Sequence, residues 1–185
     1  LHTSECGRDQ KVWVPEGDVI SKTTFENGQV QPIALPVSDV YTSLQTGLID
    51  TIAANMTSAI ALQWHTKLTH TTDIPLTFLM GTLVIDAKVY NKIAADDQRI
   101  IERVMTATFA AMDKENEQNE AKARQALAQN GMQFVTLSDA DKQAWSELAK
   151  RSINELADDN VYPVDHYQQL QQMLQDYRQR TAASL

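Results

Sequence analysis

The feature that most constrains this chain is the stretch of residues 95–130, which contains neither proline nor glycine. A helix of this extent has roughly 36 residues and is about 54 Å long at 1.5 Å per residue. The first half is strongly amphipathic, with one face made by Ile100, Ile101, Val104, Met105, Thr108, Phe109 and Met112. Residues 113–120 are polar on every face, as in an exposed helix that bridges two packed bodies. The alternative is two helices with a hinge near Asn116, because most helices are much shorter.

Strand-like and helix-like segments alternate along the first part of the chain. Strands are predicted at residues 11–14, 32–35 and 49–54, and helices at 19–25, 39–48 and 57–68. Asp18 and Ser38 are the expected N-caps of the first two helices. Such alternation indicates βαβ units with a parallel sheet. The apolar run 78–85 predicts a strand buried on both faces.

Later segments give clearer end signals. Residues 132–136 predict a last strand, and residues 138–141 the start of a helix whose core face holds Trp145, Leu148 and Ile153. A C-terminal helix is predicted over residues 164–178. The predicted fold class is therefore α/β, with a mainly parallel sheet flanked by helices and one long exposed helix.

Composition and motifs exclude several classes of protein. The chain has 24 acidic and 16 basic residues and a net charge of -8 without a basic cluster, which argues against nucleic-acid binding. Its single cysteine, Cys6, rules out an internal disulfide framework and a Cys-rich zinc module. No run approaches about 18 apolar residues, so no membrane span is expected. The first nine residues do not have the pattern of a signal peptide.

Side chains that could perform catalysis lack the necessary arrangement. The histidines, His65, His70 and His166 among them, have no metal-binding spacing with each other or with the cysteine. Asp39 and Asp50 are the candidates for an acid/base pair. However, Asp39 lies in the first turn of a predicted helix, where the helix dipole favours a carboxylate, and Asp50 would order a turn or cap. No G-x-S-x-G, Walker or G-x-G-x-x-G motif occurs. We predict no catalytic residue, no metal site and no cofactor.

Position in the predicted sheet suggests where a ligand would bind. Ligands of parallel α/β sheets lie beyond the carboxyl ends of the strands, here residues 13–17 and 53–55. Both segments lead into helix N-termini, whose free N–H groups attract anions. Trp13 is expected to be either part of the core or an aromatic wall of such a cleft.

Two strings in the sequence carry a family resemblance. Lys11-Val12-Trp13-Val14-Pro15 and the run Ser38-Asp39-Val40-Tyr41-Thr42-Ser43-Leu44-Gln45-Thr46-Gly47-Leu48-Ile49-Asp50 resemble the extracytoplasmic solute-binding subunits of TRAP transporters (DctP type). Residues 90–98 resemble the family's lead into a long helix, so that the resemblance runs from about Gln10 to Gln175. It implies a periplasmic-binding-protein-like fold in which two lobes close on a small organic acid.

The resemblance also implies a domain organisation. Residues 10–77 and 131–185 would form the second, carboxy-terminal lobe. Residues 78–130 would supply a strand to the first lobe and the long interlobe helix, and residues 1–9 an unstructured or altered segment. The remainder of the first lobe has no counterpart in this sequence. Self-association of the chain is a possible way to cover the surface that this lobe would occupy.

The family's ligand-pairing groups are changed in this chain. The resemblance implies an arginine that pairs with the ligand carboxylate at the position of Trp13, and an asparagine that falls at Ala54, with Asn55 one residue late. Either the solute is less acidic, or the missing lobe binds its carboxylate, or backbone N–H groups near Gly17 do. The predicted ligand-binding residues lie at the two strand ends and the nearby apolar segments: Trp13, Pro15, Glu16, Gly17, Val37, Ala54, Asn55 and Met80.

The function that the resemblance implies is capture rather than chemistry. A periplasmic receptor would bind a small, carboxylate-containing solute and deliver it to the membrane subunits of a TRAP transporter, by a closure that ligand contacts favour. A mature receptor of this kind would have lost its signal peptide. The alternative is a sensory or protein-interaction module built on the same lobe, and an enzyme ranks third.

Overall fold

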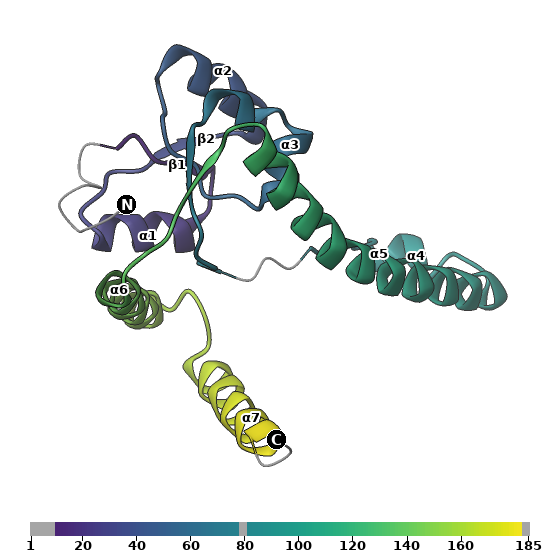
Figure 1. Ribbon diagram of the computed structural model, residues 1–185. Coiled ribbons are helices and arrows are strands. Elements are labelled where there is room, and N and C mark those ends of the chain that lie inside the picture. The colour runs from purple at the N-terminus through teal and green to yellow at the C-terminus, as the bar shows by residue number, and fades with distance from the viewer. Residues whose placement is uncertain (1–9, 78–80, 183–185) are drawn as a thin grey trace. The chain divides into compact units, whose positions relative to one another are not determined.

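The computed structural model describes residues 10–77 and 81–182. It divides into two compact units, one of residues 1–53 with 137–185 and the other of residues 54–136. The α/β character predicted from the sequence is confirmed, with short parallel sheets among a majority of helices (Figure 1).

A βαβ element opens the first unit. β1 (Trp13–Pro15) pairs in parallel with β2 (Ile33–Leu35), with Trp13 opposite Ile33 and Pro15 opposite Leu35. Between them lies α1 (Val19–Asn27), whose N-cap Asp18 accepts a hydrogen bond from the Ser21 N–H at 3.0 Å. Val12 and Val14 are buried together with Phe25 and Val30, and Trp145 packs against this cluster. Because Trp13 is also buried, β1 is covered on both faces.

The segment after β2 differs from the prediction in two places. Val37–Asp39 forms a 3₁₀ turn, η1, and α2 is only Val40–Thr46, so Ser38 is not its N-cap. Gly47 ends α2 at φ 72°, where glycine is favoured because it lacks a Cβ. The predicted strand at 49–54 is reduced to one parallel bridge between Thr51 and Val12. There the Lys11 N–H donates to the Asp50 carboxylate at 2.9 Å, whereas the Asp50 N–H donates to the Lys11 carbonyl at 3.1 Å.

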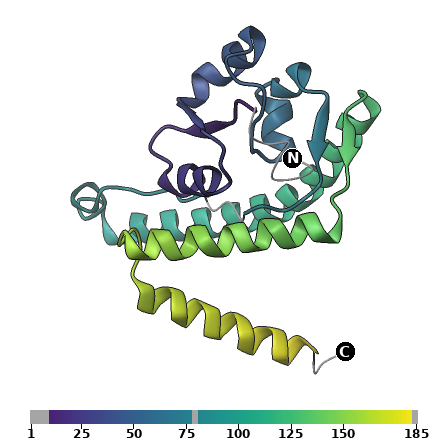
Figure 2. The same ribbon diagram turned by 90° about the vertical axis from the view of Figure 1, so that its left-hand side faces the viewer.

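The remaining helices of the first unit are α6 (Asp139–Asp158) and α7 (Val164–Ala182). α6 packs against α1, and Asn27 donates to Ser152 and Glu155 across this contact. Leu148, Ser152 and Leu156 are the buried residues of α6. α7 follows as a separate helix (Figure 2), and Leu170, Met173, Leu174 and Tyr177 are exposed on it.

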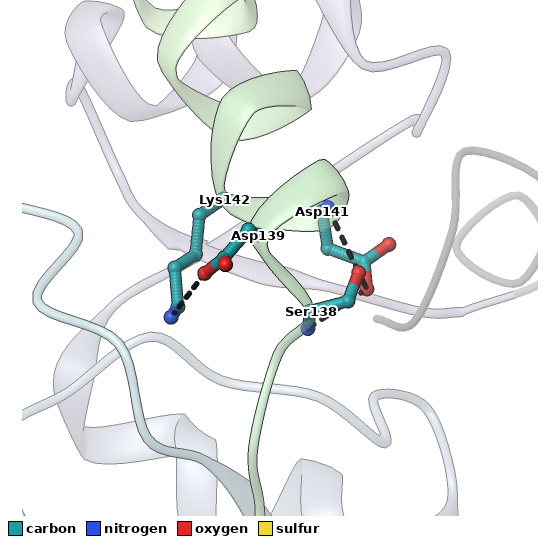
Figure 3. A network of polar contacts seen from close by, with 4 residues as sticks. All are labelled: Ser138, Asp139, Asp141 and Lys142. Carbon is teal, nitrogen blue, oxygen red and sulfur yellow. Dashed lines mark hydrogen bonds and ion pairs between the residues drawn. The ribbon is translucent and has the colours of Figure 1, made fainter.

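α6 starts where the sequence predicts a helix start, and the structure shows a capping box there (Figure 3). The Asp141 N–H donates to the Ser138 hydroxyl at 3.2 Å, and the Ser138 N–H donates to the Asp141 carboxylate at 3.2 Å. Lys142 pairs with Asp139 at 3.0 Å. These contacts satisfy N–H groups that have no partner within the helix.

We expect Ser138→Ala to lower the free energy of unfolding by about 1 kcal/mol, because the cap hydroxyl is lost and the helix itself is unchanged. Urea denaturation followed by circular dichroism measures the change. Ser146→Ala, at an exposed position within α6, is the matched control and should not lower stability, because alanine has the higher helix propensity. Equal stability of the two variants would contradict the role of the cap.

The second unit is built on the long helix. α5 (Ala95–Gln129) has 35 residues without interruption, so the single helix is confirmed and the hinge near Asn116 is wrong. Parallel strands β3 (His70–Thr72) and β4 (Gln133–Val135) form its sheet. α4 (Ala87–Tyr90) precedes α5 and contacts it where Tyr90 donates to Glu102. In the first half of α5, the side chains of Ile100, Val104, Phe109 and Met112 are exposed.

Two predictions in this unit are wrong. The helix expected at 57–68 is α3 (Met56–Ala61) followed by a 3₁₀ segment, η2 (Trp64–Lys67), because Gln63 takes a left-handed φ of 59°. The predicted buried strand 78–85 lies partly outside the described residues. Its remainder, 81–85, is exposed and in no strand, because neither sheet in the described part of the chain pairs with it.

Candidate functional site

The first set of predicted ligand residues lies at one edge of the β1–β2 sheet. Because the strands are parallel and Pro15 is opposite Leu35, the turn after β1 and the start of η1 leave the sheet at the same edge. Pro15, Glu16, Gly17 and Val37 are therefore brought together at the carboxyl ends of the strands. Val37 is 50% exposed there, and Glu16 and Gly17 are also exposed.

The turn after β1 is fixed by its glycine. The Asp18 N–H donates to the Pro15 carbonyl at 3.1 Å, and Gly17 has a φ of 81°. This φ at the third position of a turn strongly favours glycine. The turn leads directly into α1, whose cap Asp18 also accepts from the Ser21 hydroxyl at 2.6 Å. A carboxylate of the chain itself thus lies at the α1 N-terminus.

Trp13 is a core residue rather than an exposed wall. Its side chain is 4% exposed, and its indole N–H donates to the Leu35 carbonyl at 2.9 Å. The hydrogen bond joins the two strands beyond their backbone ladder. Of the two roles that the sequence left open for Trp13, the structure shows the packing role. Participation in ligand binding stays a prediction.

Ala54 and Asn55 begin the second unit, at the turn before α3. Both are exposed, and Asn55 is the N-cap of α3, where its side-chain oxygen accepts from the Ser58 N–H at 2.7 Å. Met80, the last predicted residue, lies outside the described residues. The structure thus brings together the residues around Gly17 with Val37, while Ala54 and Asn55 belong to the other unit.

The prediction of free N–H groups after Asn55 is wrong. The Glu120 carboxylate of α5 accepts from the Met56 N–H at 2.7 Å, from the Thr57 N–H at 3.1 Å and from the Thr57 hydroxyl at 2.8 Å. Because the Asn55 side chain accepts from the Ser58 N–H, the first three N–H groups of α3 all have side-chain acceptors. The sequence gives no local signal for Glu120, which lies 63 residues beyond Thr57.

The groups considered for catalysis have structural roles. Asp50 accepts from the Lys11 N–H and from the Thr51 hydroxyl, each at 2.9 Å, which is the turn-ordering role expected for it. His65 lies in η2 with its Nδ1 3.1 Å from the Ala59 carbonyl oxygen. Among residues 10–77 and 81–182, no group of three or more His, Cys, Asp or Glu side chains could hold a metal ion. The hydrogen bond to Glu102 raises the pKa of Tyr90, at the α4–α5 contact.

No helix within the described part of the chain is both long enough and apolar enough to cross a membrane.

Comparison with known proteins gives a consistent family assignment. Residues 8–160 match the model of bacterial extracellular solute-binding proteins, family 7 (DctP). The chain is 32% identical over 120 residues to the uncharacterized protein YiiZ of Salmonella typhimurium. The aligned residues cover 60% of this chain and 35% of that protein.

Solved structures of TRAP periplasmic solute-binding proteins share the fold. One from Shewanella oneidensis, with bound succinate, has a TM-score of 0.76 and 21% identity, over 85% of this chain and 52% of that one. One from Fusobacterium nucleatum, with bound sn-glycerol-3-phosphate, has a TM-score of 0.81 and 19% identity, over 98% of this chain and 57% of that one. The chain thus spans little more than half the length of these structures and about a third of YiiZ.

Proposed function

Because the chain belongs to family 7 of the bacterial extracellular solute-binding proteins, we propose that it is the carboxy-terminal part of a periplasmic receptor for a small organic acid. The receptor would deliver its solute to the membrane subunits of a TRAP transporter and would catalyse no reaction. The observation that carries the proposal is the family match over residues 8–160. The bound succinate of the Shewanella oneidensis structure indicates the kind of solute to test first.

The lobe assignment is part of this proposal. Residues 10–77 and 131–185 would form one lobe, and residues 78–130 would reach the other. The exposed apolar side chains of the first half of α5 support it, because a surface of this kind is normally covered. These boundaries differ from those of the two compact units, which meet at residues 53–54 and 136–137. The same surface would favour self-association when the chain is alone.

The solute carboxylate cannot pair with the N–H groups of Met56 and Thr57, because the Glu120 carboxylate already accepts from both. Trp13 replaces the expected arginine, and its indole N–H is bonded to Leu35. An unpaired buried carboxylate would cost several kcal/mol. We therefore propose that groups outside this chain or backbone N–H groups near Gly17 bind the carboxylate, or that the solute is less acidic. Pro15, which is half-buried, and the exposed Glu16, Gly17 and Val37 would contact the remainder of the solute.

Calorimetric titration with succinate, D-galacturonate and sn-glycerol-3-phosphate tests the proposal. We expect this 185-residue chain to bind each of them with a Kd weaker than roughly 1 mM, because one lobe cannot enclose a ligand. The full-length gene product should bind an organic acid far more tightly, with closure visible in small-angle scattering. Micromolar binding by the monomeric chain would contradict the lobe assignment, and a full-length product that binds no organic acid would contradict the function.

A further inference from the structure

A single carboxylate of α5 connects this helix to the start of α3. Glu120 is half-buried in the polar part of α5 that the sequence marks as exposed. Both of its oxygens accept hydrogen bonds from α3, through two backbone N–H groups and the Thr57 hydroxyl. Three hydrogen bonds to one ionised carboxylate form a directional contact, because charge-assisted bonds are the stronger kind.

These contacts fix the two residues that follow Asn55. Met56 and Thr57 are the first residues of α3, and Asn55 is its N-cap. α3 has six residues, too few to be stable without tertiary support. The orientation of Asn55 therefore depends on two contacts: its own bond to the Ser58 N–H and the bonds that Glu120 makes immediately after it.

α5 itself does not depend on Glu120 for its attachment. One turn later, Arg124 pairs with Asp73 at 2.5 Å and lies over the Phe134 ring at 4.2 Å from its centroid. Ala123 and Leu127 are buried on the same side of α5. Removal of the Glu120 carboxylate should therefore leave α5 in place and release only the start of α3.

We propose that Glu120 is a positioning residue for the solute site: it holds the Ala54–Asn55 turn in place and couples that turn to α5. Any displacement of α5 is then passed to Asn55 through the three hydrogen bonds. The relevance to solute capture rests on the proposed function, whereas the coupling itself does not. A hydroxyl or amide at position 120 would satisfy fewer of the α3 donors, since only a carboxylate offers two oxygens that both accept.

Amide hydrogen exchange by NMR tests the coupling without any solute. In Glu120→Ala, we expect the Met56 and Thr57 N–H groups to exchange about tenfold faster, because each loses its acceptor. The Ser58 N–H, which Glu120 does not touch, should also exchange several-fold faster, since Asn55 is no longer held. In Glu120→Gln the effect should be intermediate, which keeps the test valid if the alanine variant folds poorly.

Glu115→Ala is the matched control, because Glu115 is an exposed glutamate on the same helix. It should leave all three exchange rates at their wild-type values, and the exchange of residues around Arg124 should be unchanged in every variant. If Ser58 keeps its full protection in Glu120→Ala, Glu120 is only a local hydrogen-bond acceptor and the proposal is overturned. The same conclusion follows if Met56 and Thr57 are unaffected.

Discussion

Replacing Trp13 by alanine is expected to lower the free energy of unfolding of the first unit by about 3–5 kcal/mol, the usual range for removal of a buried aromatic ring. The side chain is 4% exposed, and its indole N–H bond to Leu35 joins β1 to β2. The variant leaves a cavity beside β1 and removes a hydrogen bond between two strands of only three residues each. Urea denaturation, with amide exchange to localise the loss to residues 10–53 and 137–182, measures the effect.

Trp13→Phe is the control that separates packing from the hydrogen bond. The phenyl ring retains much of the buried area but cannot donate to Leu35, so we expect a loss of about 1 kcal/mol from the bond and a further small loss from the reduced volume. Wild-type stability of Trp13→Ala would contradict the core role.

The elements predicted well are those whose ends are marked locally. Asp18 and Gly28 delimit α1, and Ser138 with Asp141 forms the capping box of α6. α5 follows from the lack of any helix-breaking residue up to Gly131. These signals act over a few residues, through side-chain acceptors for free N–H groups and, at Gly131 with its φ of 89°, through the backbone freedom of glycine. The sequence alone is therefore sufficient to place them.

The elements predicted poorly depend on partners that are distant or not described. Residues 81–85 are as apolar as a buried strand, but a strand forms only where another strand pairs with it. Residues 49–54 have one strand beside them, and the Asp50 carboxylate takes the Lys11 N–H that would extend the ladder. Ser38 has the right residue type for an N-cap, but the 3₁₀ turn η1 shifts the start of α2 to Val40.

The candidate site was predictable to the extent that it follows from topology. A parallel βαβ element necessarily places the end of β1 and the end of β2 at one edge, so the proximity of Gly17 and Val37 could be expected. The hydrogen bonds from the first N–H groups of α3 to Glu120 could not be predicted in this way. Glu120 lies within a run of polar residues in which nothing distinguishes it from Glu115, and only the packing of α5 against α3 brings it to Thr57.

Replacing Trp64 by alanine is expected to destabilise the second unit by about 3–5 kcal/mol. Trp64 is 3% exposed, although its neighbour Leu62 is 43% exposed. A continuous helix over 57–68 would have placed Trp64 on the same face as Ile60. Instead, the left-handed Gln63 ends the helical path after α3, and Trp64 begins η2 in a buried position. The loss should appear as faster exchange across β3, β4 and the second half of α5.

Two neighbouring substitutions complete this test. Leu62→Ala removes an exposed side chain and should change stability little, which controls for a general effect of truncation next to η2. Gln63→Gly should stabilise the unit by about 1 kcal/mol, because glycine adopts a positive φ without the steric cost that glutamine has there. A Trp64→Ala variant as stable as Leu62→Ala would contradict the core role of Trp64. A destabilising Gln63→Gly would contradict the steric cost of the positive φ at Gln63.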